Sequence, residues 1–185
     1  MSLKILLFGK PGAGKSTQAV KLAEYFHLAH FSAGDLLRKE VVSQSDLGKV
    51  IAPYVERGEI VPNGVAGKLM KSHILSEEVQ KNGYVIINYP RRIESFQEYL
   101  THDTPTIVLV LDVSEQEARK RLLLRKREDD EEETIATRLR IFREMDEQLF
   151  VWLVQEAKIP TFFCDASRSI PEVTTQLIEL ISTEV

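Results

Sequence analysis

The clearest pattern along the chain is a set of short apolar runs separated by longer segments with helical spacing of apolar residues. Four runs have the length and composition of buried strands: Ile5–Phe8, Tyr84–Ile87, Ile107–Leu111 and Thr161–Cys164. A fifth strand is expected around Leu28–Phe31, running into a turn at 32–35. Because strands that alternate with helices are joined by right-handed crossovers, these runs predict an α/β fold with a parallel sheet.

Helical segments are expected between these strands. Within residues 19–26, the apolar positions fall on one helical stripe, formed by Ala19, Leu22, Ala23 and Phe26. Ser114–Glu117 has the sequence of a capping box and predicts the start of a helix after the third apolar run in chain order. The stretch Glu40–His73 is interrupted by glycines and prolines, and it predicts short helices that protrude from the sheet.

Length, charge and cysteine content restrict the class of protein. The 185 residues are enough for one well-cored domain and too few for two. The net charge of −4 does not indicate a general nucleic-acid or membrane surface. Cys164 is the only cysteine, which excludes a disulfide framework and favours a small buried side chain. No signal peptide or membrane-length apolar run is visible, so we expect a cytoplasmic protein.

The strongest chemical signal is the segment Gly9–Thr17, which matches the phosphate-binding loop pattern G-x-x-x-x-G-K-[ST]. It lies between a predicted strand and a predicted helix, where loop amides and the helix N-terminus bind phosphate oxygens. Lys15 is expected to reach the β- and γ-phosphates of a nucleotide, and Ser16 or Thr17 to approach Mg2+. The alternatives are a glycine-rich turn without a ligand, which the flanking elements disfavour, and a dinucleotide loop, whose third glycine is missing.

Several cationic segments are candidates for contacts with phosphate. Arg38 follows the expected turn at 32–35, and Tyr89–Arg92 follows a strand, at the edge where parallel sheets bind ligands. A third group contains Arg119, Arg121, Arg125, Arg127, Arg138, Arg140 and Arg143. Alone, these residues are equally compatible with ordinary surface ion pairs. Next to a phosphate loop they favour phosphoryl transfer, which needs positioning and positive charge more than covalent chemistry. The acidic run Glu128–Glu133 is expected to be solvated at a helix N-terminus.

Taken in order, these segments resemble the nucleoside monophosphate kinase family, specifically its adenylate kinase and UMP/CMP kinase branch. The resemblance covers essentially the whole chain. It rests on the phosphate loop and on five further segments: Ser32–Arg38, Gly58–Pro62, Tyr89–Arg91, Arg121–Arg138 and Asp165–Arg168. It implies a three-layer α/β/α P-loop NTPase fold with a five-stranded parallel sheet. It also implies one kinase domain over 1–185, with a helical monophosphate-binding insert at about 32–73 and a residual lid at 125–130.

The activity implied by the resemblance is Mg2+-dependent phosphoryl transfer from ATP to a nucleoside monophosphate, with ATP and AMP giving two ADP. The protein is expected to be a monomer that binds neither nucleic acid nor membranes. Three alternatives stay open at this point: a UMP/CMP kinase-like acceptor, a kinase for another small metabolite, and a catalytically weak nucleotide-binding protein or ATPase of the same fold.

The resemblance also implies roles for individual residues. For ATP binding these are Gly12, Ala13, Gly14, Lys15, Ser16, Thr17, Arg121, Arg125 and Arg168. For monophosphate binding they are Ala33, Arg38, Glu59, Ile60, Val61, Asn88, Arg91, Ser95, Arg127 and Arg138. The catalytic group is Lys15, Arg91, Arg125, Arg127 and Arg138, and the expected Mg2+ contacts are Ser16 and Thr17.

The chain departs from the family pattern at positions that bear on the metal, the base and the lid. Ile87 and Asn88 stand where the family usually has Asp-Gly, and that Asp helps to hold the water shell of Mg2+. Asp112, Asp129 and Asp130 are candidates to compensate. Ala33 and Ser95 stand at base-reading positions and leave the base preference open.

In the lid, only Lys126 separates Arg125 from Arg127. Because a lid excludes water from the reacting groups, so short a lid predicts ATP hydrolysis without acceptor or less efficient transfer.

Overall fold

The computed structural model describes residues 2–62, 64–125 and 131–185. Five strands form one sheet: β1 (Lys4–Gly9), β2 (Ala29–Ser32), β3 (Tyr84–Ile87), β4 (Ile107–Asp112) and β5 (Thr161–Asp165). Their order is β2-β3-β1-β4-β5, and all neighbouring pairs are parallel. The predicted parallel sheet is confirmed, and every predicted strand lies within one residue of its observed bounds.

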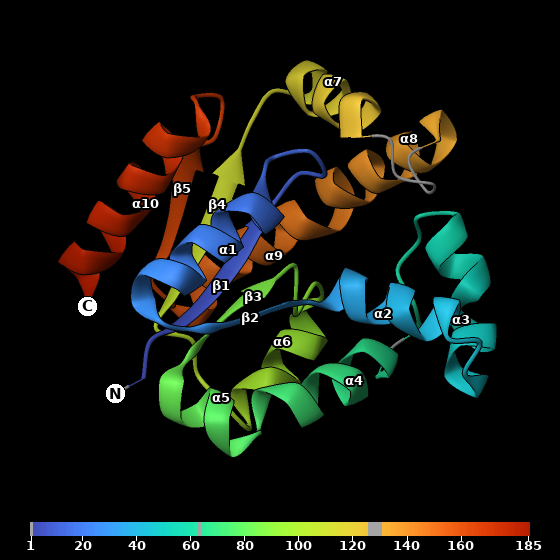
Figure 1. Ribbon diagram of the computed structural model, residues 1–185, viewed down its shortest axis with the longest axis horizontal. Helices are drawn as coiled ribbons and strands as arrows, with labels where there is room; N and C mark the ends of the chain where they lie inside the picture. Colours follow the sequence, from blue (N-terminus) through green and yellow to red (C-terminus); the bar gives the residue numbers. More distant parts are fainter. Residues whose placement is uncertain (1, 63, 126–130) are drawn as a thin grey trace.

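Helices cover both faces of this sheet (Figure 1). They are α1 (Lys15–Phe26), α2 (Ala33–Val42), α3 (Asp46–Glu56), α4 (Val65–Ile74), α5 (Glu77–Asn82), α6 (Ile93–Leu100), α7 (Glu115–Arg125), α8 (Glu132–Ile141), α9 (Glu147–Trp152) and α10 (Ile170–Glu184). Two π-helical segments, η1 (Phe142–Asp146) and η2 (Leu153–Ala157), flank α9.

The two cores follow from the alternation of side chains along each strand. On β1, Ile5 and Leu7 point to the face that α1, α7, α8 and α10 cover, whereas Leu6 and Phe8 point to the opposite face. That second face is covered by α4, α5, α6, η1 and α9. The central strands β1, β3 and β4 are buried on both sides, which explains why they appear in the sequence as continuous apolar runs. The result is the expected three-layer α/β/α architecture.

Local capping determines where several helices begin. The expected turn at 32–35 is wrong: Ser32 ends β2, and α2 begins at the next residue. The Ser32 hydroxyl accepts a hydrogen bond from the Asp35 amide at 3.3 Å, so Gly34 is held inside the first turn. Ser114 caps α7 in the same way, accepting from the Glu117 amide at 3.2 Å.

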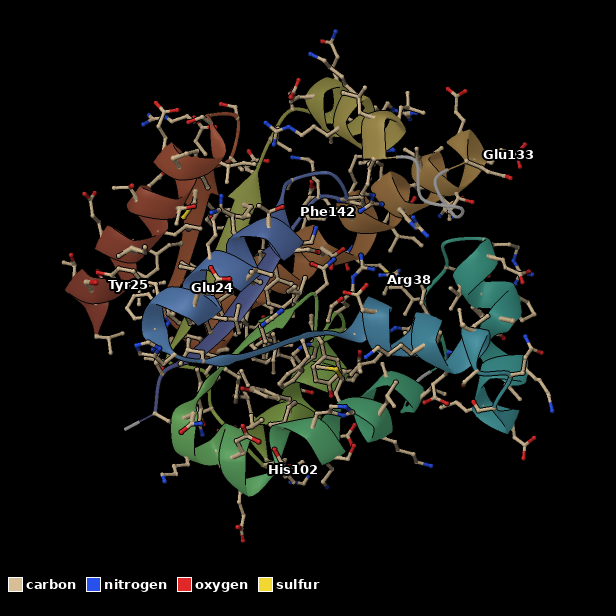
Figure 2. All side chains as sticks on the ribbon, viewed as in Figure 1. Glu24, Tyr25, Arg38, His102, Glu133 and Phe142 are labelled. Carbon is tan, nitrogen blue, oxygen red and sulfur yellow. The ribbon has the colours of Figure 1, made fainter. Side chains whose placement is uncertain are left out.

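The described acidic residues 131–133 lie at the N-terminus of α8, the kind of position predicted for the acidic run. Glu131 occupies the position before the helix, and Glu132 and Glu133 are exposed in its first turn. Glu133 lies at the outer end of α8 (Figure 2). Negative charge at this end is favourable because it meets the positive end of the helix dipole. Residues 128–130 of the same acidic run lie outside the described residues.

Helices α2 and α3 project from the sheet (Figure 1). Helix α4 instead packs on the second face of the sheet through Met70 and Ile74, so the projection predicted for Glu40–His73 applies only to the first part of that stretch. Helices α2 and α3 pack closely at Gly48, where an added Cβ would lie 2.0 Å from the Glu40 carbonyl oxygen. A glycine at this point therefore allows the two short helices to approach each other. This contact makes α2 and α3 one packed unit beside the sheet.

Two observations bear on the remaining expectations. Cys164 on β5 is buried, and burial raises the pKa of its thiol to about 11, so it is a neutral packing residue at ordinary pH.

None of the helices in the described residues combines the length and the apolar composition that a membrane span requires.

Candidate active site

A cleft of about 740 Å³ lies at the carboxyl ends of the strands. Parallel sheets bind ligands at this edge because the loops that leave the strands converge there. The cleft is lined by every predicted site residue that the structure describes: Gly12, Ala13, Gly14, Lys15, Ser16, Thr17, Ala33, Arg38, Glu59, Ile60, Val61, Asn88, Arg91, Ser95, Arg121, Arg125, Arg138 and Arg168. Arg127 lies outside the described residues, as do Asp129 and Asp130.

The phosphate loop adopts a conformation that depends on its glycines. Gly12 and Gly14 have φ values of 84° and 88°, in the left-handed region that favours glycine. The loop also packs directly on α7, because a Cβ added at Gly12 would lie 2.4 Å from the Ala118 carbonyl oxygen. Helix α1 starts at Lys15, and the first amides of a helix have no partner within it. These amides are the groups that bind anions at a helix N-terminus.

Lys15 is held inside the loop. Its ammonium is buried and donates hydrogen bonds of 2.7 Å to the carbonyl oxygens of both Gly9 and Lys10. Burial and, to a smaller extent, the charge of Arg91 lower the pKa of Lys15, and the charge of Asp146 partly opposes them; the net pKa is about 7. Both carbonyl oxygens that accept hydrogen bonds from the Lys15 ammonium are neutral, so a phosphate bound at the loop would give it a negatively charged partner.

Arg91 makes a two-point ion pair with a buried carboxylate. It follows β3, and its Nε donates to Oδ1 of Asp146 at 2.9 Å while its Nη2 pairs with Oδ2 of the same carboxylate. Burial lowers the pKa of Arg91, but the charge and hydrogen bonds of Asp146 outweigh this effect and raise the pKa overall. The sequence analysis missed Asp146, which no motif marks.

The other arginines approach the cleft from different elements. Arg38 forms an ion pair with Asp35, and Figure 2 shows it extending from α2 toward the part of the molecule where Phe142 lies. Arg121 on α7 donates to Glu117 at 2.8 Å and to the carbonyl oxygen of Ala166 at 3.0 Å, which links α7 to the loop before α10.

The buried Nε of Arg92, another cleft residue, lacks any hydrogen-bond partner among the described residues. A buried donor without a partner costs free energy, so it marks a place where a ligand acceptor would be favourable.

Another part of the cleft lining comes from residues 55–62, at the end of α3 and after it. Glu59 turns its carboxylate to Arg57, with which it makes hydrogen bonds of 3.0 and 2.9 Å. Those hydrogen bonds lower the pKa of Glu59 and keep the side chain occupied. Gly58 has a φ of 70°, and a Cβ there would lie 2.9 Å from Cγ2 of Thr134 on α8. The Thr134 hydroxyl donates to the Glu56 carbonyl oxygen at 3.1 Å, so α8 contacts the end of α3.

The residues present fit a Mg2+ ion that arrives with nucleotide phosphates. Ser16 and Thr17 are exposed and line the cleft beside Lys15, and hydroxyl oxygens are suitable ligands for this ion. Ile87 presents an apolar, buried side chain at the end of β3. Asp112 forms an ion pair with Lys10 and is absent from the described lining of the cleft. The described residues contain no group of three or more acidic, histidine or cysteine side chains that suits a metal.

Comparison with known proteins identifies the family. The model of the family described as adenylate kinase matches residues 7–158. The chain belongs to the adenylate kinase family.

Among relatives of this adenylate kinase family member, "Adenylate kinase 1" of Schistosoma mansoni is 39% identical over 175 residues, which cover 91% of this chain and 87% of the relative. A second Schistosoma mansoni protein, "Adenylate kinase", is 38% identical over 174 residues with the same coverage. "Adenylate kinase" of Streptococcus pneumoniae strain 70585 is 39% identical over 92 residues, which are 50% of this chain and 43% of that relative.

Proposed function

We propose that the protein is an ATP:AMP phosphotransferase, which converts ATP and AMP into two molecules of ADP. The observation that carries this proposal is the single cleft in which the phosphate loop faces Arg38 and Arg91. Such a cleft has room and positive charge for a donor and an acceptor nucleotide. The names of the relatives support AMP over a pyrimidine monophosphate as acceptor.

The proposal assigns roles to residues that line the cleft. The loop amides and Lys15 are assigned to the ATP phosphates, and Arg121, Arg125 and Arg168 to the ATP base. Arg38 and Arg91 are assigned to the acceptor phosphate, and the backbone at 59–61 with Ala33, Asn88 and Ser95 to the acceptor base.

Arg125 and Arg138, together with Arg127, balance the charge that develops on the transferred phosphoryl group. The reaction needs the two phosphates held in line, and these cations would position them and balance their charge.

Ser16 and Thr17 would hold a Mg2+ ion that arrives with ATP, and the ion would supply positive charge to the phosphate oxygens. Ile87 at the end of β3 offers no oxygen to such an ion.

The proposal includes an assignment of regions: residues 32–73 are the monophosphate-binding insert, and 125–130 are a residual lid. The projection of α2 and α3 beside the cleft supports the first assignment. The second is supported by the short sequence that joins Arg125, the end of α7, to Glu132, the start of α8. A monomeric state and a cytoplasmic location stay predictions.

An acceptor panel tests the proposed function. Purified protein is incubated with Mg2+ and ATP and with AMP, dAMP, CMP, UMP, GMP or no acceptor, and the nucleotides are separated by chromatography. We expect ADP to form from AMP in preference to the diphosphates of the other bases. Formation of CDP or UDP instead identifies a pyrimidine acceptor, and ADP release that ignores the acceptor identifies an ATPase.

Two arginine variants test the placement of the acceptor. Arg91→Ala removes a cation that lines the cleft, so the KM for AMP is expected to rise while the KM for ATP changes little. Arg140→Ala is the control, because Arg140 is exposed, pairs with Glu144 and is not among the residues that line the cleft. Equal effects of the two substitutions would contradict the assignment.

A further inference from the structure

Asp146 is a buried carboxylate that the proposed reaction does not use directly. Its side chain is only 3% exposed, at the end of the π-helical segment η1. A buried carboxylate is strongly unfavourable unless a cation and hydrogen bonds compensate for lost solvation. Arg91 supplies both, through Nε and Nη2, and no other element of the described structure gives Asp146 an ion pair. The carboxylate and this guanidinium therefore form one unit.

The pairing uses one edge of the guanidinium and leaves another available. A guanidinium has five N–H donors arranged around a plane, and a carboxylate that takes Nε and Nη2 occupies one side of it. The Nη1 hydrogens and one Nη2 hydrogen stay available. Arg91 is 25% exposed and lines the cleft, whereas Asp146 lies behind it. The side of the guanidinium that Asp146 does not take is therefore the side open to a ligand.

We infer that Asp146 is a positioning residue, which grips one edge of Arg91 so that the opposite edge faces the phosphate of the acceptor nucleotide. This inference rests on the proposed function for the identity of the acceptor. The role fits general requirements of phosphoryl transfer, in which misplacement of a binding group by about 1 Å costs up to about a hundredfold in rate.

The backbone around Asp146 is suited to hold such a side chain still. Phe142, Leu149 and Phe150 precede and follow it and are buried in the core on one face of the sheet. The rings of Phe142 and Phe150 lie 5.9 Å apart, and Phe150 also contacts Phe8 of β1 at 5.6 Å. The wider turn of a π-helix shifts the direction of the side chains that follow it, a geometry often found at functional sites. Asp146 is thus anchored to the sheet itself.

Positioning and simple charge attraction predict opposite signs for loss of this carboxylate. If only net charge mattered, removing Asp146 would make the cleft more positive and AMP would bind more tightly. If Asp146 positions Arg91, its removal frees the guanidinium to adopt other rotamers, and AMP binds more weakly. The sign of the change in AMP affinity therefore decides between the two.

The test compares Asp146→Asn with Glu144→Gln, a control in the same π-helical segment whose pair with Arg140 is exposed. Binding of AMP and of a non-hydrolysable ATP analogue is measured by titration calorimetry, and turnover by ADP formation. Asp146→Asn is expected to weaken AMP binding about tenfold. Binding of the ATP analogue is expected to weaken less, because the Asp146 charge also helps to keep Lys15 protonated. Glu144→Gln is expected to match the wild type in both. Unchanged or tighter AMP binding by Asp146→Asn overturns the inference.

A double variant separates positioning from a general loss of structure. In an Arg91→Ala background, Asp146→Asn has nothing to position and is expected to cause no further loss of AMP affinity. An additional loss of the same size would overturn the inference. If Asp146→Asn does not fold, Arg91→Lys tests the same pair by changing the cation. A lysine keeps the positive charge but cannot make the two parallel hydrogen bonds that a guanidinium makes to a carboxylate. Wild-type AMP affinity in Arg91→Lys would also overturn it.

These binding measurements do not depend on turnover. A wild-type protein that binds AMP but forms no ADP from it would refute the proposed function and still allow the Asp146 comparison. A wild-type protein that transfers phosphate normally, with Asp146→Asn indistinguishable from it, would refute the inference alone.

Discussion

Replacement of Lys15 by methionine is expected to remove a pH dependence of folding that this one buried amine causes. In the unfolded chain the pKa of a lysine is 10.5, whereas burial and the neighbouring Arg91 lower the pKa of Lys15 to about 7 in the folded protein. Between these two pH values the unfolded chain holds a proton that the folded protein has released. Stability in this window therefore rises as the pH rises.

The magnitude follows from the two pKa values. Each pH unit within the window adds about 1.4 kcal/mol to the free energy of unfolding, which amounts to about 2 kcal/mol between pH 7 and pH 9 after allowing for partial titration at pH 7. Below pH 7 both states are protonated, and the buried charge costs about 5 kcal/mol relative to a neutral amine. Lys15→Met removes that cost together with two hydrogen bonds, to Gly9 and Lys10, each contributing about 1.5–3 kcal/mol.

The assay is urea unfolding of the wild type and Lys15→Met at pH 6, 7, 8 and 9, without nucleotide. Because the other titrating groups are the same in both proteins, they cancel in the difference between the two curves. The wild type is expected to gain about 2 kcal/mol relative to the variant from pH 7 to pH 9. The variant should remain folded and lose ATP binding, since the ammonium is the phosphate contact. Parallel stability curves would refute the burial argument.

Three further outcomes follow from features of the cleft and core. Gly12→Ala should cost about 2 kcal/mol or more and weaken ATP binding, since its Cβ meets the Ala118 carbonyl at 2.4 Å. Gly14→Ala, whose Cβ meets no described atom within 4 Å, should cost only about 1 kcal/mol in urea unfolding; equal losses would contradict the steric argument. ATP hydrolysis without acceptor should be measurable beside phosphoryl transfer, and negligible hydrolysis at a normal family rate of transfer would refute the effect assigned to the short lid. Cys164, buried with a pKa of about 11, should react with a disulfide reagent at pH 8 only after unfolding; rapid labelling of the native protein would disagree.

The strands of the sheet and the residues that line the cleft could be predicted from the sequence for a physical reason. Strands buried on both faces must be continuous apolar runs, so β1, β3 and β4 stand out without any alignment. In a parallel sheet the segments that follow the strands all meet at one edge. Arg38, Arg91 and the phosphate loop therefore had to come close together once the strands were placed.

The features that the sequence did not reveal depend on tertiary packing. Gly34 was assigned to a turn because glycine favours turns, but the cap at Ser32 and the packing of α2 on α3 keep it helical. Asp146 is one carboxylate among many polar residues, and only the register of η1 carries it to Arg91. The carbonyl partners of Lys15 likewise depend on how the loop folds back on itself. No local pattern encodes any of these contacts.

The contact between α8 and the end of α3 bears on how nucleotides enter and leave the cleft. The Thr134 hydroxyl and the Glu56 carbonyl join two walls that are 78 residues apart in the chain, directly beside the cleft residues Gly58 and Arg138. Any widening of the cleft on this side must break that bond. A neutral hydrogen bond of this kind contributes only about 1 kcal/mol, so it adds little to the free energy needed to separate α8 from the end of α3. This bond therefore opposes the departure of a nucleotide on that side only slightly.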